Sequence, residues 1–194
     1  MVGAYVFDFD GVINDSLDLV YYFNKIIDPD LTLEQYKKRF EGNLYSSTDV
    51  TPEKILQYFQ LKGDATEKSL LKPHIKEILI ELSKNAPLFI ITSDRTPAVQ
   101  KYFQNHGIAQ IITQIYGVEI HHSKEIKFSM LFKDHNLTKE ECLFVTDTLG
   151  DILEAHKVGV KTIGVTEFGF HDALTLQKGN PYKIISKLEE LLYF

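Results

Sequence analysis

The sequence predicts an α/β fold, a doubly wound parallel sheet with a small inserted α-helical domain. From residue 84 onward, short apolar runs alternate with helical patterns, an order typical of a parallel sheet covered by helices on both faces. Before that point, one apolar run at residues 4–8 is followed by a long stretch of helical patterns without a convincing second strand. We therefore expect residues 1–14 and 84–194 to form the sheet domain, and residues 15–83 to form a helical cap near the carboxyl ends of the strands.

The helical block contains several helices divided by turn signals. Residues 16–27 crowd apolar side chains at helical spacing, and the sequence DPD then ends the pattern. Thr32 followed by Gln35 forms a capping-box pair. Further helices are expected at 32–42, at 51–59 with Thr51 as N-cap, and from Pro73 to Lys84 with the apolar residues on one face.

The second half of the chain alternates strand and helix signals. Apolar runs bounded by turn residues indicate strands, and Pro97 in a first turn followed by Gly107 brackets the first of the later helices. The expected strands are 87–92, 110–117, 142–147, 161–165 and 182–186, and the expected helices are 96–107 with Thr96 as N-cap, 124–136, 149–159, 172–178 and 187–192.

The composition favours a globular protein that acts on a small molecule. The 194 residues are 44% hydrophobic and carry a formal net charge of −6, which argues against nucleic-acid binding through bulk phosphate attraction. There is no charged leader, and no apolar run approaches the roughly 20 residues that span a bilayer, so we expect no membrane association. The one cysteine, Cys142, cannot form an internal disulfide, which suits a reducing compartment and predicts a cytoplasmic location.

Acidic and hydroxyl side chains follow several of the predicted strands. The carboxyl ends of parallel strands share one edge of a sheet, so these side chains are expected to converge there. Converging carboxylates need a hard divalent cation, and Mg²⁺ favours a few carboxylates together with water and a substrate phosphate. A hydroxyl pair at the same edge supplies neutral donors for the oxygens of an anion. The residues are Asp8 and Asp10 after the first strand, Thr92 and Ser93 after the second, and Asp147 and Asp151 after the run CLFVT.

A lysine in the sequence HHSKEIKF could place a cation against a bound phosphate, and both Lys124 and Lys127 are candidates. Other ligand motifs do not fit the chain. The spacing after Asp8 lacks the later acidic and glycine positions of a calcium-binding EF-hand loop. A Walker-type phosphate loop is absent, and no glycine fingerprint of a dinucleotide fold follows the first strand.

These motifs together resemble the haloacid dehalogenase superfamily of phosphohydrolases, in the branch with a helical cap after the first strand. DFDGVINDS resembles the first family motif, IITSDR the second and VTDTLGDI the fourth, and Lys124 is chosen for the lysine of the third motif. The resemblance implies a Rossmann-like core and a site of the phosphoglycolate phosphatase type. Thr146 stands where relatives commonly have glycine. The presence of Asp10 favours a phosphatase over a haloacid dehalogenase proper, which lacks this second aspartate.

The resemblance also implies a role for each residue. Asp8 is expected to be the nucleophile and Asp10 the general acid and base, with Thr92, Ser93 and Lys124 binding the phosphoryl group. Mg²⁺ is expected at Asp8, Asp10, Asp147 and Asp151, with Asp10 contributing its backbone carbonyl.

The expected function is therefore Mg²⁺-dependent hydrolysis of a small phosphorylated metabolite through an aspartyl-phosphate. Two alternatives stay open: a phosphomutase that returns the phosphoryl group to a sugar, and a binding protein that keeps the fold without turnover. The basic run at 37–39 could draw an anionic substrate inward or could be a solvated helix face.

Overall fold

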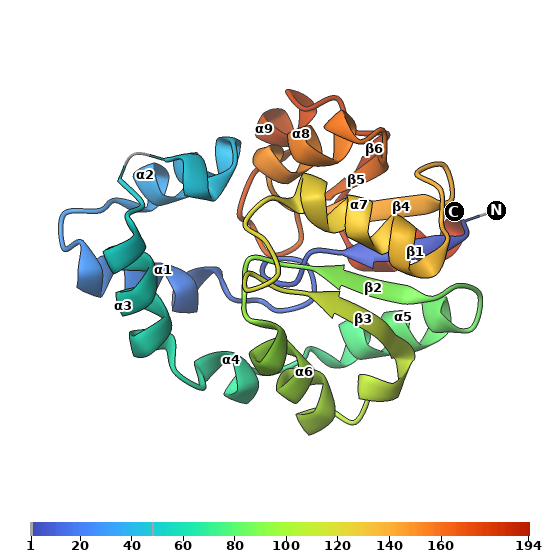
Figure 1. Cartoon of the computed structure of the whole chain (residues 1–194), viewed down its shortest axis with the longest axis horizontal. Helices are drawn as coiled ribbons and strands as arrows, with labels where there is room; N and C mark the ends of the chain where they lie inside the picture. Colours follow the sequence, from blue (N-terminus) through green and yellow to red (C-terminus); the bar gives the residue numbers. More distant parts are fainter. Residues whose placement is uncertain (1, 48) are drawn as a thin grey trace.

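The structure is a computed structural model that describes residues 2–47 and 49–194. Its centre is a six-stranded sheet with the strand order β3-β2-β1-β4-β5-β6 (Figure 1). Every pairing between neighbouring strands is parallel, which confirms the predicted fold class. The strands are β1 (Ala4–Phe7), β2 (Leu88–Ile91), β3 (Ile112–Tyr116), β4 (Cys142–Thr146), β5 (Lys161–Val165) and β6 (Lys183–Ile185).

The strand residues form two apolar layers, one on each face of the sheet. Successive residues of a strand point to opposite faces, so Phe7 belongs to one buried cluster and its neighbour Val6 to the other. The central strands are buried along their whole length, because helices cover both faces. The helices are α1 (Leu17–Ile27), α2 (Leu33–Lys38), α3 (Pro52–Lys62), α4 (Ala65–Lys68), α5 (Pro73–Ser83), α6 (Thr96–Asn105), α7 (Lys124–His135), α8 (Leu149–Lys157) and α9 (Ala173–Gln177), with 3-10 turns η1 (Arg39–Glu41), η2 (Leu44–Ser46), η3 (Ala109–Ile111) and η4 (Leu188–Tyr193).

The observed N-cap residues agree with the predicted ones at two helices and differ at a third. The capping box of Thr32 and the N-cap at Thr51 are both confirmed. The N-cap predicted at Thr96 is wrong, since Thr96 is the first helical residue and Arg95 takes the cap position. The Thr96 hydroxyl accepts a hydrogen bond from the amide of Gly117 at 3.0 Å instead. The last predicted helix forms the 3-10 turn η4.

Helices α1, α2 and α3 lie together beyond the carboxyl ends of the strands (Figure 1). Helix α5 packs on the sheet and not with these cap helices, because Ile75, Leu79 and Leu82 belong to the same buried cluster as Leu88 of β2. The expected cap range of 15–83 includes this helix. Since its apolar face packs on the sheet, we propose that the cap ends before Pro73.

Candidate active site

The predicted site residues lie at the carboxyl edge of the sheet, where three neighbouring strands end. Asp8 directly follows β1, Thr92 follows β2 and Asp147 follows β4. Strand β1 lies between β2 and β4 in the sheet, so the three chain segments leave it side by side. A cavity between this edge and the cap is lined by Asp8, Asp10, Thr92, Ser93, Lys124 and Asp151 from the sheet side.

Lys124 links two of the carboxylates. Its ammonium nitrogen lies 2.8 Å from Oδ2 of Asp8 and 2.7 Å from Oδ2 of Asp151. Thr146, the last residue of β4, donates its hydroxyl to the same Asp151 oxygen at 2.8 Å. Lys124 is the first residue of α7 and is buried, so the helix start places the cation at the strand ends.

Burial and ion pairing act in opposite directions on the pKa values of Asp8, Asp151 and Lys124. Burial raises the pKa of Asp8 well above its usual value, although Lys124 opposes the shift. Burial also works against the ionisation of Asp151, but the charge of Lys124 and three hydrogen bonds outweigh it and lower the pKa of this carboxyl. For Lys124, burial disfavours the charged form, yet the two carboxylates raise its pKa above the usual value. The lysine is therefore charged at neutral pH.

Asp147 has no such partner. It is fully buried, and neither of its carboxylate oxygens has a hydrogen-bond partner. Burial raises its pKa well above the usual value, and the nearby charges of Asp8 and Asp151 raise it further. Gly11, at a φ of +76°, gives it room, because a Cβ on this glycine would lie 1.8 Å from Oδ2 of Asp147. A buried carboxylate without a partner is costly, and a cation would offset that cost.

These donors fit a magnesium ion. Among residues 2–47 and 49–194, no three His, Cys, Asp or Glu side chains converge closely enough to hold a metal by themselves. Mg²⁺ does not need such a cage, because it usually keeps several waters and binds one or two carboxylates together with substrate phosphate oxygens. Asp8 and Asp147 supply two carboxylates of that kind. The side chain of Asp151 pairs with Lys124, as that of Asp8 does, and the side chain of Asp10, whose backbone carbonyl was expected at the ion, lies 3.8 Å from Lys62.

Asp10 belongs to a second charged group that includes a cap residue. Lys62, the last residue of α3, lies 3.8 Å from Asp10 and 2.6 Å from Asp94. Thr66 donates its hydroxyl to Asp94 at 2.8 Å, and Asn14 donates to Asp10 at 3.4 Å. Burial raises the pKa of Asp10, and Lys62 partly offsets this shift. A raised pKa suits a carboxyl group that must begin a reaction protonated.

Sequence reasoning missed Lys62 and Asp94. Asp94 lies next to Ser93 in the motif IITSDR, and its place directly after the hydroxyl pair was a usable signal. Lys62 ends a cap helix far from the motifs in the sequence, and nothing in the local pattern marks it as a buried ion-pair partner.

The hydroxyl pair directly follows β2, and the alternative lysine contacts its backbone. The Thr92 hydroxyl accepts a hydrogen bond from the Asp94 amide at 2.9 Å, and Ser93 lines the cavity beside it. Lys127 donates to the backbone carbonyl of Thr92 at 2.6 Å, and burial lowers its pKa to about 8. Of the two candidate lysines, Lys124 is the one in contact with Asp8.

The comparisons with known proteins agree with this arrangement. The sequence pattern of the family described as haloacid dehalogenase-like hydrolase matches residues 5–165. The chain belongs to this family. The match includes the first, second and fourth motifs and Lys124, and it confirms the resemblance predicted from those residues.

Several relatives of the chain are named phosphoglycolate phosphatase. A phosphoglycolate phosphatase of Photorhabdus laumondii is 30% identical over 131 residues, which are 66% of this chain and 56% of that protein. Another, of Synechococcus elongatus, is 25% identical over 202 residues, 97% of this chain and 95% of that protein. The chain spans little more than half the length of the first curated relatives that it matches.

Solved structures of the same family share the fold over the whole chain. A haloacid dehalogenase-like family hydrolase of Streptococcus pneumoniae matches with a TM-score of 0.79 and 25% identity, covering 100% of this chain and 98% of that one. A haloacid dehalogenase-like hydrolase of Bacteroides fragilis matches with a TM-score of 0.84 and 24% identity, covering 98% and 100%. Within the part of the chain that the structure describes, none of the helices has the length and apolar character needed to cross a membrane.

Proposed function

We propose that this chain is a Mg²⁺-dependent phosphatase that hydrolyses a small phosphorylated metabolite through an aspartyl-phosphate. The observation that carries the proposal is the pair Asp8 and Asp147, two buried carboxylates at neighbouring strand ends, with Lys124 in contact with Asp8. Phosphate esters carry negative charge, so a carboxylate nucleophile needs nearby cations to approach one. The relatives named phosphoglycolate phosphatase support the same reaction class.

In the first step Asp8 attacks phosphorus. A carboxylate oxygen forms the new P–O bond, the bond between phosphorus and the alcohol oxygen breaks, and the bonding pair leaves with that oxygen. Asp10 delivers a proton to the leaving alcohol, which its raised pKa favours. Thr92, Ser93 and Lys124 hold the phosphoryl oxygens.

In the second step water releases phosphate. Asp10, now a carboxylate, takes a proton from the water as it attacks phosphorus, and the P–O bond to Asp8 breaks. Asp8, Asp147 and the backbone carbonyl of Asp10 would hold Mg²⁺, which when bound would neutralise phosphoryl charge as a Lewis acid.

Hydrolysis of 4-nitrophenyl phosphate tests the nucleophile and the metal together. We expect turnover by the wild type in Mg²⁺, loss of turnover in excess chelator, and a fall of about a thousandfold or more for Asp8→Asn. Asp18→Asn, an exposed carboxylate in the first turn of α1, is the matched control and should keep the wild-type rate.

Metal binding has its own readout. Mg²⁺ should raise the melting temperature of the wild type, and this increase should be smaller in Asp147→Asn. Full activity of Asp8→Asn would contradict the proposed nucleophile. An equal rise of melting temperature with Mg²⁺ in the wild type and in Asp147→Asn would contradict the proposed metal ligands. Phosphate retained on a sugar rather than released into solution would favour the phosphomutase alternative.

A further inference from the structure

We propose that the alcohol part of the substrate is an uncharged, largely apolar group of aromatic type, and that the cap selects against a second anionic group. This inference rests on the proposed phosphatase function and names the substrate class of the same site. It follows from the side of the cavity opposite the phosphate-binding residues, where the cap supplies the wall.

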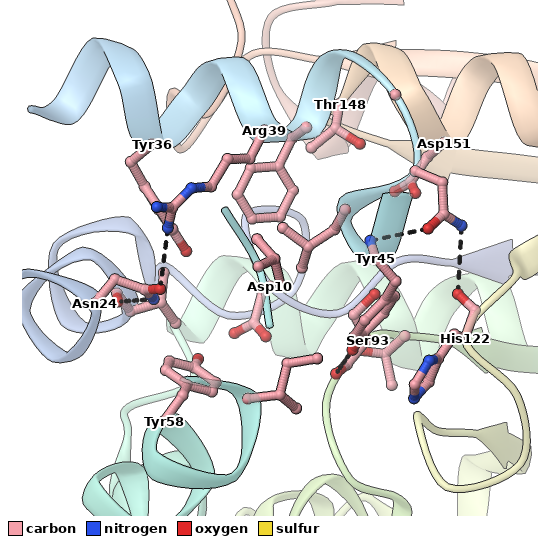
Figure 2. Close-up of a pocket in the computed structure, with 18 of the residues that line it drawn as sticks. Asp10, Asn24, Tyr36, Arg39, Tyr45, Tyr58, Ser93, His122, Thr148 and Asp151 are labelled. Atoms are coloured by element: carbon pink, nitrogen blue, oxygen red, sulfur yellow. Dashed lines mark hydrogen bonds between the residues drawn. The ribbon is translucent and has the colours of Figure 1, made fainter. Parts of the chain in front are cut away.

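The cap side of the cavity is mostly apolar and rich in aromatic rings. Figure 2 shows Tyr36, Tyr45 and Tyr58 arranged around the space next to Asp10. Aromatic rings favour edge or offset contacts with another flat ring, and they give it more attraction than its buried area alone. The aromatic residues of this wall are Tyr36, Phe40, Tyr45, Tyr58 and Phe59 of the cap, and Phe170 of the sheet domain lies beside them.

These rings are held in place by one another and by neighbouring backbone. Phe40 packs edge-on against Tyr36 and against Phe170, with ring centroids 5.2 Å apart in both pairs. Tyr45 stacks on the ring of His122 at 4.1 Å and donates its hydroxyl to the Ser93 carbonyl at 3.4 Å. A wall fixed in this way is already shaped for a flat apolar group before the ligand enters.

The charged residues of the cap wall are paired with one another. Nε of Arg39 donates to Asp49 at 2.7 Å, and its Nη2 lies 2.5 Å from the same carboxylate and 3.7 Å from Asp28. Lys54 lies 3.6 Å from Asp28. Two cations therefore face two carboxylates, and all four residues line the cavity. Burial lowers the pKa of His122, which keeps this ring neutral at pH 7.

A second anionic group on the substrate would therefore find each cation of this wall, among the described residues, already facing a carboxylate, although Nη2 of Arg39 makes no hydrogen bond. The remaining lining cation, Lys124, already faces Asp8 and Asp151 on the phosphate side. A carboxylate placed against the aromatic rings would lose its hydration without a charge partner, which is unfavourable. An uncharged ring loses no such hydration there and gains contact area.

Three phosphate esters of primary alcohols with similar leaving-group basicity test the inference: benzyl phosphate, 4-carboxybenzyl phosphate and ethyl phosphate. With the full chain in Mg²⁺, we expect kcat/KM for benzyl phosphate to exceed both others by about tenfold or more. Equal or faster hydrolysis of 4-carboxybenzyl phosphate, or of 2-phosphoglycolate, would overturn the inference and leave the phosphatase proposal standing. If the folded protein hydrolyses 4-nitrophenyl phosphate in Mg²⁺ but none of these esters, the inference fails and the phosphatase proposal stands; if it hydrolyses 4-nitrophenyl phosphate no more than these esters, both fail.

Two pairs of variants locate the selectivity. Asp49→Asn removes a partner of Arg39, so the rate ratio of 4-carboxybenzyl to benzyl phosphate should rise several-fold. Asp64→Asn, an exposed cap carboxylate paired with Lys68, should leave this ratio unchanged. An unchanged ratio in Asp49→Asn would refute the pairing argument.

The second pair concerns the aromatic wall. Tyr58→Ala should reduce the preference for benzyl over ethyl phosphate, whereas Tyr22→Ala, an exposed cap tyrosine outside the cavity, should retain it. A ratio of two substrates does not depend on the fraction of folded protein, so partial unfolding of a variant cannot imitate the effect. Retention of the full preference in Tyr58→Ala would count against the proposed wall.

Discussion

Lys127 is a single residue whose burial gives the protein a pH-dependent stability. Its side chain is fully buried, its ammonium group donates to the Thr92 carbonyl, and its pKa is lowered to about 8. Between this pH and the ordinary lysine pKa of about 10.4, the unfolded chain binds the proton that the folded chain has released. The contribution of Lys127 to the free energy of unfolding should therefore increase as pH rises from about 8 to 10, by as much as a few kcal/mol.

Urea unfolding of wild type and Lys127→Met across this range measures that contribution. The difference in unfolding free energy between the two proteins should change with pH in favour of the wild type. Lys133→Met, an exposed lysine on the same helix, serves as control and should show no such change. A pH-independent difference for Lys127→Met would show that the lysine keeps its ordinary pKa in the folded protein.

At the scale of elements, Lys62 joins helix α3 of the cap to the loop after β2. Its buried ammonium group pairs with Asp94 and lies near Asp10. Removing one partner of a buried ion pair leaves an uncompensated charge and typically costs about 3 to 5 kcal/mol. We expect Lys62→Met to lower the free energy of unfolding by an amount of this order in urea titrations.

A second substitution separates charge from packing. In Lys62→Met/Asp94→Asn the buried carboxylate is also neutralised, so part of the lost stability should return. Lys68→Met breaks an exposed pair with Asp64 in the cap and should change stability little. If Lys62→Met is as stable as Lys68→Met, the ion pair does not hold the cap helix to the sheet.

For the whole molecule, the sequence predicted what local patterns determine. Buried strands and polar strand ends are local features, and Asp8, Thr92 and Asp147 were found because each directly follows a strand. The place of helix α5 on the sheet and the pairing of Lys62 with Asp94 depend on how distant segments pack. Periodicity reports that a helix has an apolar face, but not which surface covers it.

The contact between the cap and helix α8 depends on Gly150, which distant segments of the chain surround. A Cβ on Gly150, in the first turn of α8, would lie 2.1 Å from the carbonyl oxygen of Gly42 and 2.9 Å from that of Phe40. Both are backbone atoms, so Gly150→Ala should force the cap away from α8. A Cβ on Gly42, on the other side of the contact, meets no atom within 4 Å and needs no unusual φ. Hydrogen exchange should therefore increase at residues 40–44 in Gly150→Ala and stay at the wild-type level in Gly42→Ala. Equal exchange in the two variants would mean that the cap is not seated on this helix in solution.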